Sequence, residues 1–164
     1  MRLWIKAGII FFTLIIELIM ANILAFDVVK PDLMLIVIIC LSFLSNSEGG
    51  IIIGFTGGLA KDIFSVNLLG THALVKTIIG YISGIIRERI FYQHLLWIIT
   101  IVTFLFTFLN NILIYYLLES LHNDYNFIAI FMKHIVLQAI VNSILAPIIF
   151  ISIRKIFTYL KRWS

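Results

Sequence analysis

The sequence predicts an all-α integral membrane protein with six transmembrane helices and both termini in the cytoplasm. Of its 164 residues, 62% are hydrophobic and only 12% are charged, and its mean hydropathy is +1.14. An average soluble domain has about 25% charged residues, so this composition excludes a water-soluble globular protein. One membrane pass with its turn takes about 27 residues, so the chain has room for about six passes and for no sizeable aqueous domain.

The first part of the chain contains one long and two short apolar segments. The long segment is predicted to cross the membrane at residues 7–25, and the sequence FDVVKPD ends it. Pro31 favours a helix start, and Asp32 suits the first turn because the helix dipole favours an acid there. Two shorter helices follow, at residues 33–45 and 50–64. A helix of about 14 residues is only about 21 Å long, against a hydrocarbon core of about 30 Å, so this pair forms either a full transmembrane hairpin or a re-entrant one.

Three further spans and the placement of the basic residues complete the predicted topology. The spans are residues 68–86, 95–118 and 127–153. A cytoplasmic N-terminus places eight basic residues inside and two outside, which follows the positive-inside rule. The eight are Arg2, Lys6, Arg87, Arg89, Arg154, Lys155, Lys161 and Arg162, and the two are Lys30 and Lys61. Both chain ends stay inside whether or not the second and third helices cross fully.

The segment 153–164 is predicted to be a basic amphipathic tail on the inner leaflet. At about 100° per residue, its basic and apolar residues fall on opposite arcs of a helix. Such a segment anchors to anionic lipid through its basic face. The anchoring residues are Arg154, Lys155, Lys161, Arg162 and Trp163.

Two predicted spans contain glycines at intervals of four residues. Gly50, Gly54 and Gly58 share one side of the third helix, and Gly80 and Gly84 repeat the spacing in the fourth. Small residues at this spacing let two helix backbones approach closely inside a membrane. The grooves either pack the protein's own helices together or receive a transmembrane helix of a partner. One of the two grooves could serve packing and the other could serve the partner.

Two charged residues fall near the middle of predicted spans. Glu17 lies in the first and Lys76 in the fourth, at nearly the same expected depth. A charge at the bilayer centre costs about 3 kcal/mol on insertion scales, so each needs a partner. We therefore expect a buried Glu17–Lys76 ion pair that fixes packing; a proton or substrate site is the less favoured alternative.

The sequence predicts no enzyme and no nucleic-acid binding, metal site or cofactor. It contains no nucleophile elbow, phosphate-binding loop or metal-binding pair of histidines on one helix face. Its basic residues lie at the ends of apolar runs, where they set topology. The single cysteine, Cys40, has no partner for a disulfide bond.

Four stretches of the sequence resemble the rod shape-determining protein MreD family. They are Pro31-Asp32-Leu33, then Gly54-Phe55-x-x-Gly58-Leu59-x-x-Asp62, and Leu69-Gly70-x-x-Ala73-Leu74 with Gly80-Tyr81. The resemblance implies a multi-pass protein of the bacterial cytoplasmic membrane that acts in cell elongation and peptidoglycan synthesis without chemistry of its own. It also implies the partners MreC, RodA, a class B penicillin-binding protein and MreB.

The expected docking site for MreC is the groove of Gly50, Gly54 and Gly58, with Phe55 beside it and Asp62 at its outer end. Replacing Gly54 and Gly58 by leucine is expected to release MreC without loss of the protein itself. The MreD family is also similar in fold to the substrate-binding subunits of energy-coupling-factor vitamin transporters. A vitamin-binding subunit is therefore the alternative function, with His72, Asp124, Lys133 and His134 as pocket candidates.

Overall fold

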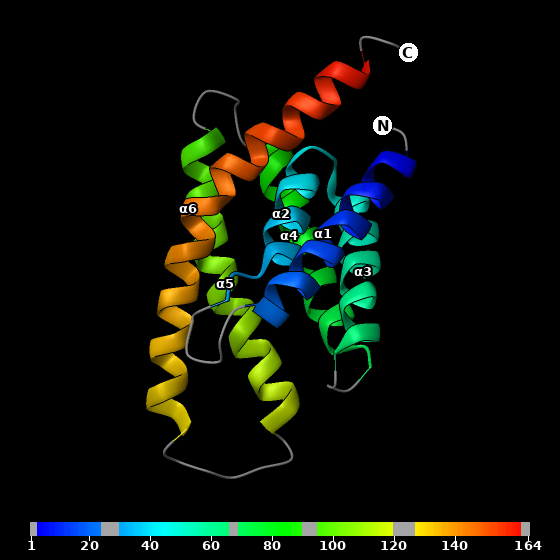
Figure 1. Cartoon of the computed structure of the whole chain (residues 1–164). Coiled ribbons are helices and arrows are strands. Elements are labelled where there is room, and N and C mark those ends of the chain that lie inside the picture. Colours follow the sequence, from blue (N-terminus) through cyan, green and yellow to red (C-terminus); the bar gives the residue numbers. More distant parts are fainter. Residues whose placement is uncertain (1–2, 24–29, 66–68, 90–94, 120–126, 162–164) are drawn as a thin grey trace.

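The structure, a computed structural model, describes residues 3–23, 30–65, 69–89, 95–119 and 127–161, which contain six α-helices. For residues 3, 22, 118, 119, 127–133 and 161, only the backbone is described. The helices are α1 (Leu3–Ile23), α2 (Leu33–Phe43), α3 (Ser47–Phe64), α4 (Thr71–Arg89), α5 (Leu95–Glu119) and α6 (Phe127–Lys161). The predicted all-α class with six helices is confirmed for these residues (Figure 1).

The helices alternate in direction, so α1, α3 and α5 begin at the end of the bundle where α2, α4 and α6 finish (Figure 1). We call this end the basic end. Among the residues near it whose side chains are described, five are basic and two are acidic. They are Lys6, Arg87, Arg89, Arg154 and Lys155, and the acids Glu48 and Glu88. The start of α1 and the end of α6 therefore lie on the same side of the molecule.

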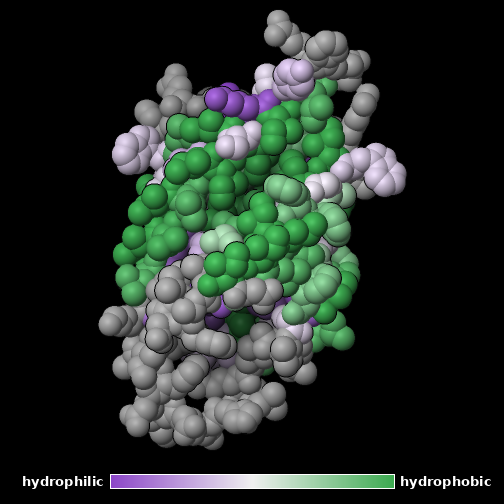
Figure 2. Space-filling view, in the orientation of Figure 1, coloured by the Kyte–Doolittle hydropathy of each residue, from purple (hydrophilic) through white to green (hydrophobic). Residues whose placement is uncertain are grey.

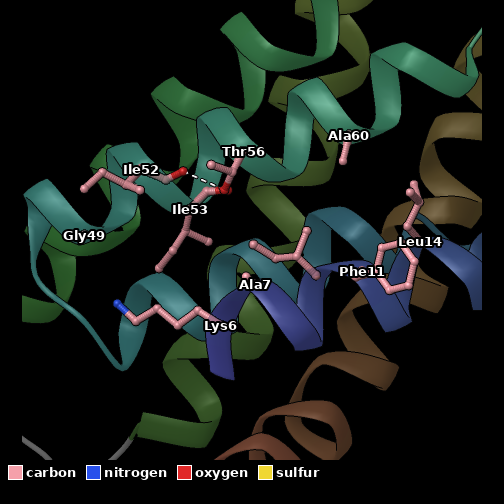
Figure 3. Close-up of a pocket in the computed structure, with 10 residues that line it drawn as sticks. Lys6, Ala7, Phe11, Leu14, Gly49, Ile52, Ile53, Thr56 and Ala60 are labelled. Carbon is pink, nitrogen blue, oxygen red and sulfur yellow. Dashed lines mark hydrogen bonds between the residues drawn. The ribbon is translucent and has the colours of Figure 1, made fainter. Parts of the chain in front are cut away.

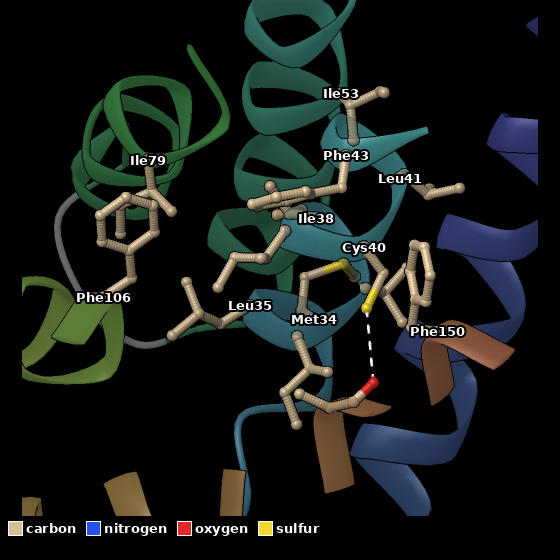
Figure 4. Close-up of a cluster of buried hydrophobic side chains, with 14 of the residues drawn as sticks. Met34, Leu35, Ile38, Cys40, Leu41, Phe43, Ile53, Ile79, Phe106 and Phe150 are labelled. Atoms are coloured by element: carbon tan, nitrogen blue, oxygen red, sulfur yellow. Dashed lines mark hydrogen bonds between the residues drawn. The ribbon is translucent and has the colours of Figure 1, made fainter. Parts of the chain in front are cut away.

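Helix α2 forms the centre of the bundle and packs against each of the other five helices (Figure 4). All residues from Met34 to Phe43 are buried, because this helix is apolar all round. Its start has the predicted acidic cap: the Asp32 carboxylate accepts a hydrogen bond from the Leu35 amide at 2.9 Å. Cys40 is buried in this core, and its Sγ lies 3.8 Å from the Ala146 carbonyl of α6.

The prediction that all six helices cross a membrane is not confirmed. Helix α2 has only 11 residues, which gives it a length of about 16 Å, roughly half of the hydrocarbon core. Within the described ranges, three helices are long and apolar enough to cross, at Trp4–Ala21, Leu95–Leu117 and His134–Leu160. The chain folds α2 into the interior of the bundle instead, where its neighbours cover it.

The outside of the bundle carries a broad apolar band (Figure 2). Large apolar side chains such as Phe12, Ile101 and Ile144 are each more than half exposed. In α5, the exposed Trp97 and Tyr116 are separated by about 28 Å along the helix axis. Exposed aromatic residues at this separation are typical of the two interfaces of a bilayer.

Helix α6 has 35 residues and continues without a break into the predicted tail. Figure 1 shows that α6 bends in its orange part, and the helix contains Pro147, which cannot donate the backbone hydrogen bond of its turn. In the tail, Arg154 and Lys155 are exposed, and Ile153 is buried. The Lys161 side chain, Arg162 and Trp163 lie outside the described part of the chain.

Candidate functional site

Four charged side chains form a continuous network between the helices, in the half of the bundle away from the basic end. The Lys61 ammonium of α3 lies 2.6 Å from a Glu17 oxygen of α1 and 3.1 Å from an Asp32 oxygen. The same Asp32 oxygen lies 2.9 Å from the Lys76 ammonium of α4. We call Glu17, Lys61, Asp32 and Lys76 the charge network; its two positive and two negative charges balance.

Polar side chains extend the charge network to the remaining helices. The Lys76 ammonium contacts the Asn110 side-chain oxygen of α5 at 3.5 Å. The Asp32 amide donates to the Asn142 side-chain oxygen of α6 at 3.1 Å, and the Asn142 amide group donates to the Thr107 hydroxyl of α5. The network therefore connects α1, α3, α4, α5 and α6 to Asp32, the residue that caps α2, at one level of the bundle.

The expected direct Glu17–Lys76 ion pair does not form in the structure. Glu17 pairs with Lys61, and its second oxygen accepts a hydrogen bond from the Met34 amide at 2.9 Å. Lys76 pairs with Asp32. The two residues belong to the same charge network, but Lys61 and Asp32 lie between them.

Sequence reasoning missed Asp32 and Lys61 because both were assigned to the ends of membrane-spanning helices. The short α2 explains the error for Asp32. Since this helix occupies only about half of a membrane thickness, its first residues start deep in the bundle, at the level of Lys76. A fully buried lysine, with 0% of Lys76 exposed, requires a nearby acid. An acid directly before a helix that is too short to span a membrane was the signal in the sequence that could have identified Asp32 as the partner of Lys76.

Helices α3 and α4 form the most closely packed pair, and their glycines face each other. A Cβ at Gly54 would overlap the Lys76 carbonyl, and a Cβ at Gly50 would overlap the Gly80 carbonyl. Gly58 lies against the backbone of His72 and Ala73, and Gly84 against that of Ser47. The groove of Gly50, Gly54 and Gly58 is thus filled by α4 of the same chain. It is not open to a partner, which corrects its assignment as a docking groove.

Asp62 caps α4 instead of forming the open end of a groove. Its carboxylate accepts hydrogen bonds from the backbone amides of Gly70 at 3.1 Å, His72 at 3.0 Å and Ala73 at 2.9 Å. Gly70 has a φ of +98°, a left-handed conformation that glycine adopts without strain. Asp62 is only 1% exposed, so it holds Gly70 and the start of α4 from inside the protein.

Replacing Asp62 by alanine is expected to lower the free energy of unfolding by about 1–3 kcal/mol, because three amide donors, two of them in buried hydrogen bonds, lose their acceptor. Thermal unfolding of the purified protein in detergent measures the change. Glu48→Gln is the matched control, since Glu48 is an exposed acid of the same helix. Equal stability of the two variants would contradict the capping role.

A second carboxylate caps α3 at the opposite end of the α3–α4 pair. The Ser47 amide donates to the Glu88 carboxylate at 2.8 Å, and the Gly49 amide donates to the Asn46 side chain at 3.0 Å. The hydrogen bond from Ser47 lowers the pKa of Glu88 from its ordinary value. The contribution of this cap to the stability of the fold is therefore present at neutral pH, and it is lost as the pH falls through the lowered pKa of Glu88.

Four large apolar residues from the stretches that resemble a known family lie on the outer face of the α3–α4 pair, away from α2. Phe55 and Leu59 of α3 are 51% and 39% exposed, and Leu74 and Tyr81 of α4 are 53% and 43% exposed. We call these four residues the hairpin face. The adjoining glycines face inward, so one stretch of sequence supplies both the tight contact and an exposed apolar surface.

Of the four polar residues proposed for a vitamin pocket, the structure describes the side chains of His72 and His134. His72 is buried behind α3, and its Nδ1 has no hydrogen-bond partner among the described residues. His134 is exposed. Asp124 and the Lys133 side chain lie outside the described residues. Within the described ranges, no three His, Cys, Asp or Glu side chains are grouped as metal ligands.

Comparison with known proteins gives one family match. The family model described as rod shape-determining protein MreD matches residues 2–156 of the chain. No curated protein and no solved structure matches it. The expected fold likeness to energy-coupling-factor subunits is therefore not confirmed.

Proposed function

This chain belongs to the rod shape-determining protein MreD family, and on that premise we propose that it is a non-enzymatic membrane scaffold of the bacterial cell-elongation machinery. The family gives it a role in determining rod shape. The proposed partner is MreC, bound through transmembrane helix contacts. RodA, a class B penicillin-binding protein and MreB are the proposed further components, and peptidoglycan synthesis is the process that the scaffold supports.

The closed charge network favours a scaffold over a transporter. Each charge of the network faces an opposite charge, and Asn110 and Asn142 connect it to α5 and α6. A buried network that is fully paired fixes the arrangement of the helices. The bundle therefore presents a rigid lateral surface, which is what a partner helix needs for docking.

The proposed location is the cytoplasmic membrane, with the basic end on the cytoplasmic side. This orientation brings Arg154 and Lys155 to the anionic inner leaflet, as the positive-inside rule favours. Lys161, Arg162 and Trp163 are proposed to extend the same anchor.

The hairpin face is the proposed docking surface for MreC. The observation that carries this proposal is the exposure of Phe55, Leu59, Leu74 and Tyr81 on the most tightly built pair of helices. Phe55 was expected in the partner interface from the sequence, and it keeps that role here on a different surface. Buried aromatic residues commonly dominate the energy of an interface.

The double variant Phe55→Ala/Tyr81→Ala is expected to weaken MreC binding at least tenfold, because each lost aromatic contact costs about 1–2 kcal/mol. Co-purification of full-length MreC from membranes of co-expressing cells measures the loss, together with the rounding of rod-shaped cells. Stability should change little, since both side chains are about half exposed.

The matched control is Ile101→Ala/Ile144→Ala, which removes similarly exposed residues from α5 and α6. Normal MreC recovery with the hairpin-face variant, or equal loss with the control variant, would reject this face as the docking surface.

A further inference from the structure

Helix α1 packs loosely along α3 and leaves an apolar groove beside it (Figure 3). The groove has a cavity volume of about 280 Å³. Residues of α1 line one wall and residues of α3 the other. They include Ala7, Phe11 and Leu14 of α1, and Ile52, Thr56 and Ala60 of α3. This groove lies on a different side of α3 from Phe55, so it is separate from the hairpin face.

The groove has one charged residue, and it lies at the basic end. The carbon chain of Lys6 forms part of the lining, and its ammonium points away from the apolar interior (Figure 3). Within the described residues, no acid forms an ion pair with Lys6. The one hydroxyl in the lining is already satisfied, because Thr56 donates to the Ile52 carbonyl at 2.8 Å. The groove therefore offers a cation at its mouth and only apolar surface inside.

The dimensions of the groove fit one lipid chain. The lining of α3 extends from Gly49 to Ala60, about 16 Å along the helix axis, which is close to half of a hydrocarbon core of about 30 Å. The charge network lies just beyond, at Glu17 and Lys61. A transmembrane helix of this length and of about 10 Å diameter occupies on the order of 1,000 Å³. This is several times the volume of the cavity, so the groove is too small for a partner helix.

We propose that this groove binds one anionic phospholipid of the leaflet at the basic end, with an acyl chain between α1 and α3 and the headgroup phosphate on Lys6. Apolar lining favours the chain, and the unpaired ammonium favours the negative phosphate. The lipid fills the space that α1 leaves open and supports the position of α1 against α3. This site does not depend on the identity of the partner that docks on the hairpin face.

Native mass spectrometry of the full-length protein, purified with phosphatidylglycerol or phosphatidylcholine, tests the proposal. We expect about one phosphatidylglycerol to be retained per chain and much less phosphatidylcholine. Lys6→Gln is expected to lower retention about fivefold, since one lysine near a headgroup contributes about 1 kcal/mol, and Lys6→Arg should keep it. Equal retention of both lipids, or no difference between the Gln and Arg variants, would overturn the proposal.

A matched pair of groove variants gives a second test. Ala7→Phe fills this groove and should abolish retention, whereas Gly8→Phe points to a different side of α1, where a Cβ meets nothing within 4 Å, and should keep it. A photo-crosslinking residue at Thr56 should react with lipid. Crosslinking to a partner helix, or normal retention in the Ala7→Phe variant, would overturn the assignment.

Discussion

Asp32→Asn is expected to lower the free energy of unfolding by about 3–5 kcal/mol, the cost of leaving a buried charge without its partner. Asparagine keeps a side-chain oxygen that can cap the Leu35 amide, so the variant removes mainly the charge. Lys76 would then be fully buried with only the Asn110 oxygen at 3.5 Å. Unfolding of the purified protein in mixed detergent micelles measures the loss.

Lys30→Gln is the control for this prediction, because Lys30 is close to Asp32 in sequence but its ammonium contacts the exposed Ala21 carbonyl, outside the charge network. It should change stability by less than about 1 kcal/mol. If Asp32→Asn were as mild as this control, the charge network would not be what holds the helices together.

Gly54→Ala is the second variant with a large expected effect, a loss of about 1–3 kcal/mol or more from overpacking. The added methyl group would overlap the Lys76 carbonyl, so α3 and α4 would have to separate along their whole contact. Larger residues should prevent folding. The leucine variants at Gly54 and Gly58 are therefore expected to remove the protein from the membrane, not to release MreC selectively.

The matched control for the glycine prediction is Gly8→Ala in α1, where the new Cβ meets nothing within 4 Å. This change should be neutral or stabilising, because alanine is the better helix former. The amount of folded protein in membranes and its melting temperature in detergent measure both variants. A Gly54→Ala variant as stable as Gly8→Ala would refute the close approach of α3 and α4.

The number and order of the helices could be predicted because apolar runs and their breaks are local properties of the sequence. The start of α2 is an example: Pro31 and Asp32 mark it in the sequence, and Asp32 caps it in the structure. The helix-packing glycines were likewise visible from their spacing. Which helix fills a glycine groove depends on tertiary packing, and the sequence left that open between the protein's own helices and a partner.

The ion pairs could not be predicted because they depend on the depth of each charge, and depth was assigned from the centres of the predicted spans. Glu17 and Lys76 were rightly identified as buried or half-buried charges that need partners. Their partners come from the ends of α2 and α3, which the short α2 brings into the bundle. The groove beside Lys6 was also invisible in the sequence, since it results from the loose packing of α1 in three dimensions.

A double-mutant cycle on Lys76 tests the charge network most directly. Combined with Lys76→Met, Asp32→Asn should show a coupling energy of about 1–3 kcal/mol in unfolding experiments, because the double variant removes both members of a contacting pair. Glu17→Gln should couple more weakly to Lys76→Met, since Glu17 pairs with Lys61. Stronger coupling of Lys76 to Glu17 than to Asp32 would contradict the arrangement described for the centre of the bundle.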